Sequence, residues 1–124
     1  MEGKRRRSWE RTALILIAAA SVVIMLLAFR MEKRLINERA MYYQLQSIRK
    51  SIDLFRTVEG RNPESLKELA SESFSFSKEE LQRPYLITPA PDARGLFPDV
   101  FGNYFDYDPK TGRVISRTPG YEGW

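Results

Sequence analysis

The feature that most constrains this chain is an uninterrupted apolar stretch near its N-terminus. Residues 12–29 contain no charged residue, no proline and no glycine, and their only polar side chains are the hydroxyls of Thr12 and Ser21. As a helix this stretch would extend about 27 Å, close to the hydrocarbon thickness of a bilayer. A buried core helix is the alternative, but a chain of 124 residues has no core that could surround a helix apolar on every side. The stretch therefore predicts one membrane-spanning helix.

A cleaved secretory signal peptide is the competing explanation for the same residues. The apolar centre of a signal peptide has about 7 to 15 residues and is followed by a cleavage site of small residues. Here the small-residue candidate, Ala18-Ala19-Ala20, lies inside the apolar stretch. We therefore expect an uncleaved membrane anchor.

Basic residues on the two sides of the span predict its orientation. The first eleven residues contain five Lys or Arg, whereas the first five residues after Phe29 contain three. Because short basic segments stay in the cytoplasm, we expect a basic cytoplasmic tail at 1–11, a transmembrane helix at 12–30 and an extracytoplasmic domain at 31–124. The bilayer is thus the first predicted partner. The tail itself reads as disordered from Met1 to Glu10.

Composition excludes several function classes for the remaining residues. The chain has no Cys and no His, so it lacks thiol redox chemistry, the commonest general base and the commonest transition-metal ligand. Residues 60–124 carry eight basic and ten acidic residues, with no basic patch of interleaved aromatics. We therefore expect neither nucleic-acid binding nor an enzyme.

An apolar stripe follows the span, on a segment that is rich in helix formers and has no glycine before Gly60. Its members recur at helical spacing: Met41, Leu45, Ile48, Ile52 and Phe55. Traced back, the stripe meets Glu38 and Arg34, so it covers about two heptads, whereas a stable coiled coil sustains about three to four. We expect one helix from about 12 to 58, with the stripe buried by its own chain; a coiled-coil seam is the alternative.

Helix-capping and loop-forming residues are frequent after Gly60. Asn62 as cap and Pro63 at the first helical position predict the start of a short second helix. A Ser-rich loop follows, in which Phe74 and Phe76 are spaced to bury on one side.

Two further local signals lie in the C-terminal half. Ser77–Glu80 reads as a capping box that begins a single helical turn. Residues 103–107 and 113–116 flank a turn, Asp108–Gly112, that contains Pro and Gly, and this arrangement predicts a β-hairpin. Four prolines in residues 84–98 predict an irregular loop between these features.

Two segments carry a family resemblance. Residues 52–69, IDLFRTVEGRNPESLKEL, and residues 99–107, DVFGNYFDY, resemble the end of the long helix and the start of the C-terminal hairpin in type IV pilin-like proteins. They are most similar to the major pseudopilin of type II secretion systems. The resemblance implies a pilin-like α+β fold: a transmembrane helix continuing into a long helix, a short second helix, a Pro-rich loop and a C-terminal β-hairpin.

The resemblance also implies a function. It points to a non-enzymatic component or accessory of a type II secretion or type IV pilus-like apparatus in the bacterial inner membrane, with a periplasmic domain. Pseudopilins or secretion-apparatus proteins would be its partners. The alternative function is a bitopic coiled-coil scaffold of the cell-division type, which the short seam and the aromatic hairpin disfavour.

The N-terminus departs from the pattern of the resembling proteins. Pseudopilins carry a leader that is cut after a Gly and before an aromatic residue, and an acid within the apolar segment. Here Gly3 precedes Lys4, and residues 12–29 contain no acid. We therefore expect a full-length protein, without prepilin peptidase processing, that makes lateral contacts through its long helix or its hairpin face. That face includes Phe101, Tyr104 and Tyr107.

Four aspartates are the candidate metal ligands: Asp92, Asp99, Asp106 and Asp108. With carbonyls of the Pro-rich loop they could form an oxygen site for Ca²⁺, and the resembling pseudopilins bind calcium in this region. Ca²⁺ takes about six to eight oxygen ligands, and the spacing here does not match an EF-hand. The alternative is that these residues only form turns and caps. No other cofactor is expected.

Overall fold

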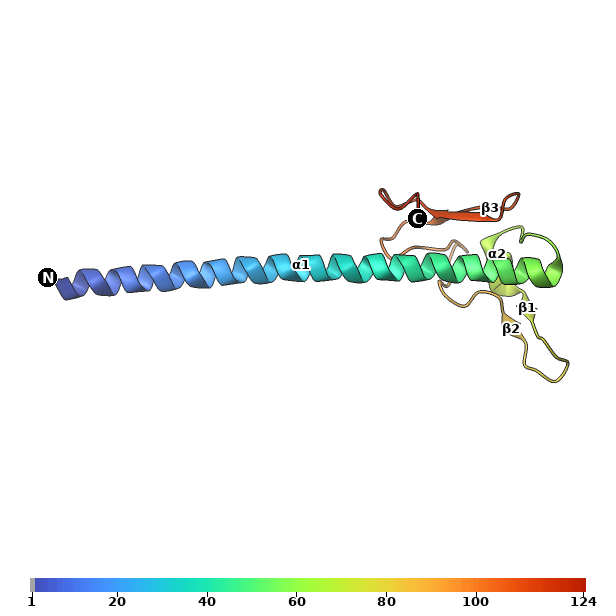
Figure 1. Ribbon diagram of the computed structural model, residues 1–124, viewed down its shortest axis with the longest axis horizontal. Coiled ribbons are helices and arrows are strands. Elements are labelled where there is room, and N and C mark those ends of the chain that lie inside the picture. Colours follow the sequence, from blue (N-terminus) through green and yellow to red (C-terminus); the bar gives the residue numbers. More distant parts are fainter. Residues whose placement is uncertain (1) are drawn as a thin grey trace. The chain divides into compact units, whose positions relative to one another are not determined.

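The structure is a computed structural model that describes residues 2–124, with side chains described from residue 7 onward. Its elements are helices α1 (Glu2–Glu59) and α2 (Leu66–Ser71) and strands β1 (Ser73–Phe74), β2 (Arg83–Pro84), β3 (Phe105–Asp108) and β4 (Arg113–Ser116) (Figure 1). The fold is α+β, as the sequence predicts, with one long helix, a short second helix and two small antiparallel hairpins.

The chain divides into two compact units. One unit ends at Ile36, and the other, the C-terminal unit, comprises Asn37–Trp124. The division lies somewhat beyond the boundary that the sequence suggests after residue 30. Each unit is described by itself below.

Helix α1 has no internal break because residues 4–59 contain neither Gly nor Pro. In its apolar stretch, Thr12 Oγ1 donates a hydrogen bond to the Ser8 carbonyl (2.9 Å), and Ser21 Oγ donates to the Ile17 carbonyl (2.8 Å). Both hydroxyls are therefore satisfied within the helix. The side chains of residues 12–29 are all exposed. The stretch is long and apolar enough to cross a membrane once.

The expectation of a disordered tail is wrong for the residues described. Helix α1 begins at Glu2, because the basic and acidic residues before Thr12 are good helix formers and continue the helix that follows. Met1 lies outside the described residues. The other end agrees with the sequence: α1 stops at Glu59, and Gly60 adopts φ +73°, the left-handed conformation that ends many helices.

The core of the C-terminal unit is built on the stripe of α1. The five stripe residues are no more than 2% exposed: Met41, Leu45, Ile48, Ile52 and Phe55. They are covered by apolar side chains from α2, the loops and both strands of the C-terminal hairpin: Leu66, Leu69, Tyr85, Leu86, Phe97, Phe105 and Val114. The prediction that the chain buries its own stripe is confirmed.

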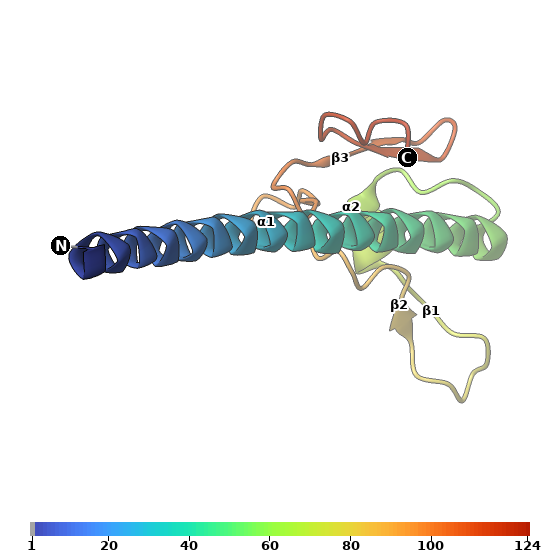
Figure 2. The same cartoon turned by 60° about the vertical axis from the view of Figure 1, so that its left-hand side comes forward.

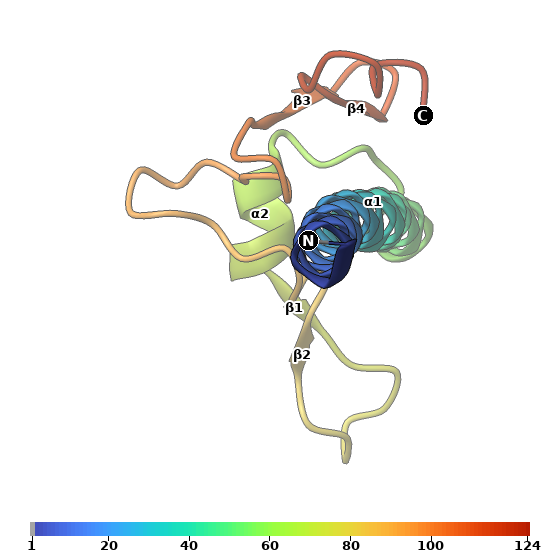
Figure 3. The same ribbon diagram turned by 90° about the vertical axis from the view of Figure 1, so that its left-hand side faces the viewer.

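The two hairpins of this unit lie on different sides of α1. The β3–β4 hairpin lies along one side, and the β1–β2 hairpin projects from the other (Figure 2). A view along α1 places α2 beside the helix, between the two hairpins (Figure 3). Helix α2 therefore lies between the two hairpins, next to the stripe.

The second helix begins later than the sequence suggests. Ser65, not Asn62, is its cap: the Ser65 hydroxyl accepts a hydrogen bond from the Glu68 N–H, and Leu66 is the first helical residue. Asn62 is used elsewhere, because its amide donates to the carbonyls of Pro109 and Lys110 in the β3–β4 turn. A distant tertiary contact thus replaces the predicted local one.

The β1–β2 hairpin is absent from the sequence predictions. Only two residue pairs join its strands, Ser73 with Pro84 and Phe74 with Arg83. Residues 75–82 therefore project as a loop, and Phe76 is 76% exposed although its ring lies 5.2 Å from the partly buried ring of Phe74. Ser77 forms a turn, in which its hydroxyl accepts from the Glu79 N–H, and no helical turn follows.

The β3–β4 hairpin agrees with the prediction. Four pairs, from Phe105–Ser116 to Asp108–Arg113, set its register. Its turn is closed by a hydrogen bond from the Gly112 N–H to the Asp108 carbonyl (2.8 Å), and Gly112 has φ +72°. A side chain at Gly112 would also meet the Asn62 amide, since a Cβ would lie 3.1 Å from Asn62 Oδ1.

Candidate functional site

Asp99 is the most buried of the four candidate ligands, at 5% exposure. One carboxylate oxygen accepts the N–H groups of Phe101 (2.9 Å) and Asn103 (3.0 Å). The other accepts the hydroxyls of Ser116 (2.8 Å) and Thr118 (2.6 Å). Asp99 therefore ties the loop before β3 to the end of β4.

Asp92 closes a turn in the preceding loop. Its carboxylate accepts the N–H groups of Arg94 (2.8 Å) and Leu96 (3.0 Å) and the hydroxyl of Tyr104 (3.1 Å). The Leu96 N–H, then the Arg94 N–H and the Tyr104 hydroxyl, lower the pKa of Asp92. The charge of this carboxylate is thus stabilised by protein donors.

Asp106 and Asp108 lie on β3 and have separate partners. Asp106 forms a two-pronged ion pair with Arg117, with distances of 2.6 and 2.8 Å, and this hydrogen bonding lowers the pKa of Asp106. Asp108 accepts the Thr111 hydroxyl (2.9 Å) and the Lys110 N–H (3.0 Å), which lower its pKa in the same order. Each aspartate therefore serves its own strand or turn.

The structure does not bring these four carboxylates together. Within residues 7–124, no group of three or more acidic side chains is placed to hold a metal ion. The turn-forming alternative describes the carboxylates of Asp92, Asp99 and Asp108, whereas Asp106 pairs with Arg117. A calcium site stays a prediction from the resemblance.

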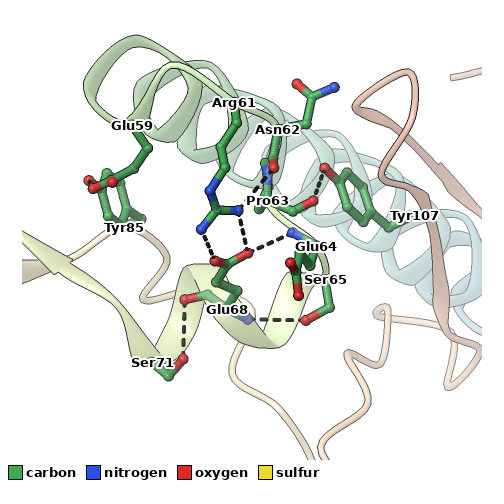
Figure 4. A network of polar contacts seen from close by, with 10 residues as sticks. All are labelled: Glu59, Arg61, Asn62, Pro63, Glu64, Ser65, Glu68, Ser71, Tyr85 and Tyr107. Carbon is green, nitrogen blue, oxygen red and sulfur yellow. Dashed lines mark hydrogen bonds and ion pairs between the residues drawn. The ribbon is translucent and has the colours of Figure 1, made fainter.

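A polar network joins the end of α1 to α2 (Figure 4). Arg61 donates to Glu68 at 2.5 Å, and Glu68 also accepts the Glu64 N–H at 2.6 Å. The Arg61 hydrogen bond is the main cause of the lowered pKa of Glu68. The Arg61 guanidinium also lies 5.0 Å from the Phe55 ring centre, within the range of a cation–π contact.

Two tyrosines extend this network on either side (Figure 4). Tyr85 donates its hydroxyl proton to Glu59 (3.0 Å), and Tyr107 donates to the Pro63 carbonyl (2.8 Å). Burial first, and then Glu59, raise the pKa of Tyr85 to about 12. Burial is also the main cause of the raised pKa of Tyr107. Both hydroxyls thus fix the break after Gly60 rather than act as acids.

The aromatics predicted to form a contact face are partly used inside the unit. Phe101 lies 5.0 Å from the Tyr121 ring, and Tyr104 bonds Asp92 and Arg94 through its hydroxyl. With Tyr107 held at Pro63, all three side chains are only half-exposed. Their remaining exposed edges form a smaller face than the sequence suggests.

The side chains that sequence reasoning missed are on the β1–β2 hairpin. Phe76 and Leu81 are 76% and 85% exposed, more than the aromatics of the predicted face. A clue for Leu81 is present in the sequence, because Lys78, Glu79 and Glu80 precede it and mark a solvated segment.

The titratable side chains with shifted pKa values are tied to structural partners, at the helix junction and in the β3 region. Comparison of the chain with protein-family models, curated proteins and solved structures found no match. Inference about function therefore depends on the chain's own sequence and geometry.

Proposed function

We propose that this chain is a non-enzymatic, single-pass membrane protein that serves as a pseudopilin-like component or accessory of a type II secretion or type IV pilus-like apparatus. One observation carries the proposal. Helix α1 has an exposed apolar stretch, and later a stripe that a small α+β unit buries. Apart from the added β1–β2 hairpin, the order of elements, from the apolar helix to the C-terminal hairpin, agrees with the order that the resemblance implies.

The proposed location is the bacterial inner membrane, with the C-terminal unit in the periplasm. The excess of basic residues before the span supports this orientation. A reporter enzyme that is active only after export, fused after Trp124, should be active. Activity of a cytoplasm-only reporter at the same position would contradict the orientation.

The coiled-coil scaffold finds less support. Its seam would need Leu45, Ile48 and Ile52 on a free helix face, but each is at most 2% exposed within the chain's own core. No second function is proposed.

Deletion of the gene in its native bacterium tests the function. We expect reduced secretion of exported proteins or reduced surface filaments, restored by the full chain. A Lys50→Asp variant should also restore them because Lys50 is exposed, whereas Ile52→Asp should not because Ile52 is in the core. Unchanged secretion and unchanged filaments in the deletion strain would refute the proposal.

Intact-mass measurement of membrane-extracted protein tests whether the chain is processed. The full-length mass is expected, because Gly3-Lys4 does not resemble a prepilin cleavage site. A species beginning between Lys4 and Thr12, found together with filaments, would instead identify a processed pseudopilin.

A further inference from the structure

Residues 75–82, the loop that joins β1 to β2, form a projecting arm (Figure 1). Its base is held by a hydrogen bond from Ser73 Oγ to Gln82 Oε1 (3.1 Å) and by the Phe74 ring, 4.8 Å from Tyr85. Leu81, at 85%, has the largest exposed fraction among the large apolar side chains described. An apolar side chain presented in this way on a fixed base is suited to insertion into another surface.

A hollow lies on the other side of the unit, between the start of α2 and β3. Its volume is about 190 Å³, and its apolar lining includes Leu66, Leu96, Phe97 and Phe105. Pockets for small molecules measure about 300 to 1,000 Å³. The hollow is therefore closer in size to one apolar side chain than to a cofactor. Leu96 is 44% exposed, so its apolar surface is open to a partner.

The charges around these two features are complementary. Lys67 lines the hollow, and Glu79 lies on the arm two residues before Leu81. Neither charged group has an ion pair within the described part of the chain. Glu64 also lines the hollow, so a partner that enters it meets one acidic and one basic side chain. The Lys67 ammonium can pair with an acidic side chain of that partner.

The arm of one chain points away from its own hollow. Arm and β3 lie on different sides of α1, while both lie beside its last turns (Figures 1 and 3). Two copies with parallel helices could therefore place the arm of one against the hollow of the other. Because the two surfaces differ, the contact would be head-to-tail and would leave a free arm and a free hollow at the ends.

We propose that Leu81 on the arm of one copy inserts into the hollow between α2 and β3 of a second copy, with Glu79 facing Lys67. The contact rests on the proposed anchoring of copies in one membrane. It joins the copies in rows without requiring a charge within the membrane span. Its apolar part is one side chain, so the single contact is weak and depends on the shared membrane for effective concentration.

Cysteine pairing tests the contact in the full-length, membrane-embedded chain. The protein has no Cys, so Leu81→Cys and Leu96→Cys can be introduced singly and the two variants co-expressed. Mild oxidation should give a disulfide-linked dimer. The matched control pairs Leu96→Cys with Ile87→Cys, because Ile87 is also apolar and 72% exposed but lies off the arm. We expect about fivefold more dimer from the first pair than from the control.

Charge exchange provides the second measurement. Glu79→Lys should lower the yield of the Leu81–Leu96 dimer, and adding Lys67→Glu to the partner copy should restore it. Equal yields from both cysteine pairs would overturn the proposal, as would a photo-crosslinker at position 81 that captures only a different protein. If the disulfide-linked dimer does not form but deletion of the gene still reduces secretion or surface filaments, this contact is refuted and the proposed function stands.

Discussion

Helix α1 contains two apolar lengths that differ in how their residues are distributed around the helix. Residues 12–29 are apolar on every side, and all of their side chains are exposed. Between Met41 and Phe55, the five stripe residues are at most 2% exposed, and the other faces carry mainly polar residues such as Lys50 and Asp53, together with the exposed rings of Tyr42 and Tyr43. The same helix thus carries one length that its own chain covers and one that it does not.

The difference shows what each length needs as a neighbour. A stripe about one-third of the circumference wide is matched by the small surface that α2 and the β3–β4 hairpin provide. A fully apolar length would need cover on all sides, which a unit of this size does not supply and a bilayer does. The distribution of apolar residues therefore matches a protein neighbour for one length and suits, for the other, the lipid neighbour that we propose.

An acidic residue in the stripe should have the largest effect. Ile52→Asp would place an unpaired carboxylate at a site that is 2% exposed, and we expect a loss of about 3 to 5 kcal/mol in the unfolding free energy of the C-terminal unit. Thermal unfolding of the detergent-solubilised chain measures this loss. Lys50→Asp, one face away and exposed, is the control and should melt close to the parent. Equal melting of Ile52→Asp and the parent would show that the stripe is free in solution.

The same substitution in the apolar span should have a different consequence. Ala20→Asp, near the middle of the stretch, is expected to cost about 2.5 to 3.5 kcal/mol of membrane insertion. The fraction of chain that resists extraction from membranes at high pH should fall, while Ala20→Leu keeps it. Melting of the C-terminal unit should not change. A lowered melting temperature would mean that the span is packed against protein, which would break the comparison.

Asp99→Ala should destabilise the C-terminal unit by about 2 to 3 kcal/mol. The substitution leaves the N–H groups of Phe101 and Asn103 and the hydroxyls of Ser116 and Thr118 without their acceptor. Denaturant unfolding at neutral pH measures the change. Asp106→Ala is the matched control, because its ion pair is at the surface and should contribute less than about 1 kcal/mol. Similar losses for both variants would contradict the role given to Asp99.

The smallest expected effect is a pH dependence from Glu68. Its folded pKa is lowered, first by the Arg61 hydrogen bond, below the ordinary value of 4.5. The stability that the ionised Glu68 carboxylate contributes is therefore fully present above about pH 5 and is lost as the pH falls through the folded pKa of Glu68. Glu68→Gln should be less stable than the parent at pH 6 by a few tenths to about 1 kcal/mol.

The gap between the two proteins should close as the pH falls through the folded pKa of Glu68, because the parent carboxylate then becomes protonated. Melting curves of both at each pH measure the gap. If the difference in stability between the two proteins were the same at every pH from 6 to 3, Glu68 would not contribute through its charge. The other carboxylates with lowered pKa values, such as Asp106, remain in both proteins and cancel in the difference.

Elements set by neighbouring residues could be predicted from the sequence. The burial of Leu45 and Ile48 follows from helical spacing, and the stop at Gly60 follows from its freedom to adopt a positive φ. The turn between β3 and β4 follows from Asp108 and Gly112. Each of these is predicted by a pattern of residues that lie close together in the sequence.

Several errors after Gly60 share one cause, which is a partner far away in the sequence. Asn62 does not cap α2, because its side-chain amide donates a hydrogen bond to the carbonyl of Lys110, 48 residues further along the chain. Phe76 is exposed because the strand that pairs with β1 begins only at Arg83 and leaves the intervening loop outside the core. The donors to Asp99 include Thr118, 19 residues further on. No local pattern records these partners.

The long separations between contacting residues have a consequence for how the protein is made. The stripe is synthesised first, but Arg49 reaches the Val114 carbonyl across 65 residues, and Glu38 accepts from Tyr121 across 83. At about 5 to 20 residues per second, the ribosome needs roughly 3 to 12 s to produce the cover after Phe55 has appeared. For that interval a ready-made apolar helix face is uncovered in every newborn chain. Assembly of this protein therefore depends on timing, and a chaperone that binds during this interval would have its greatest effect.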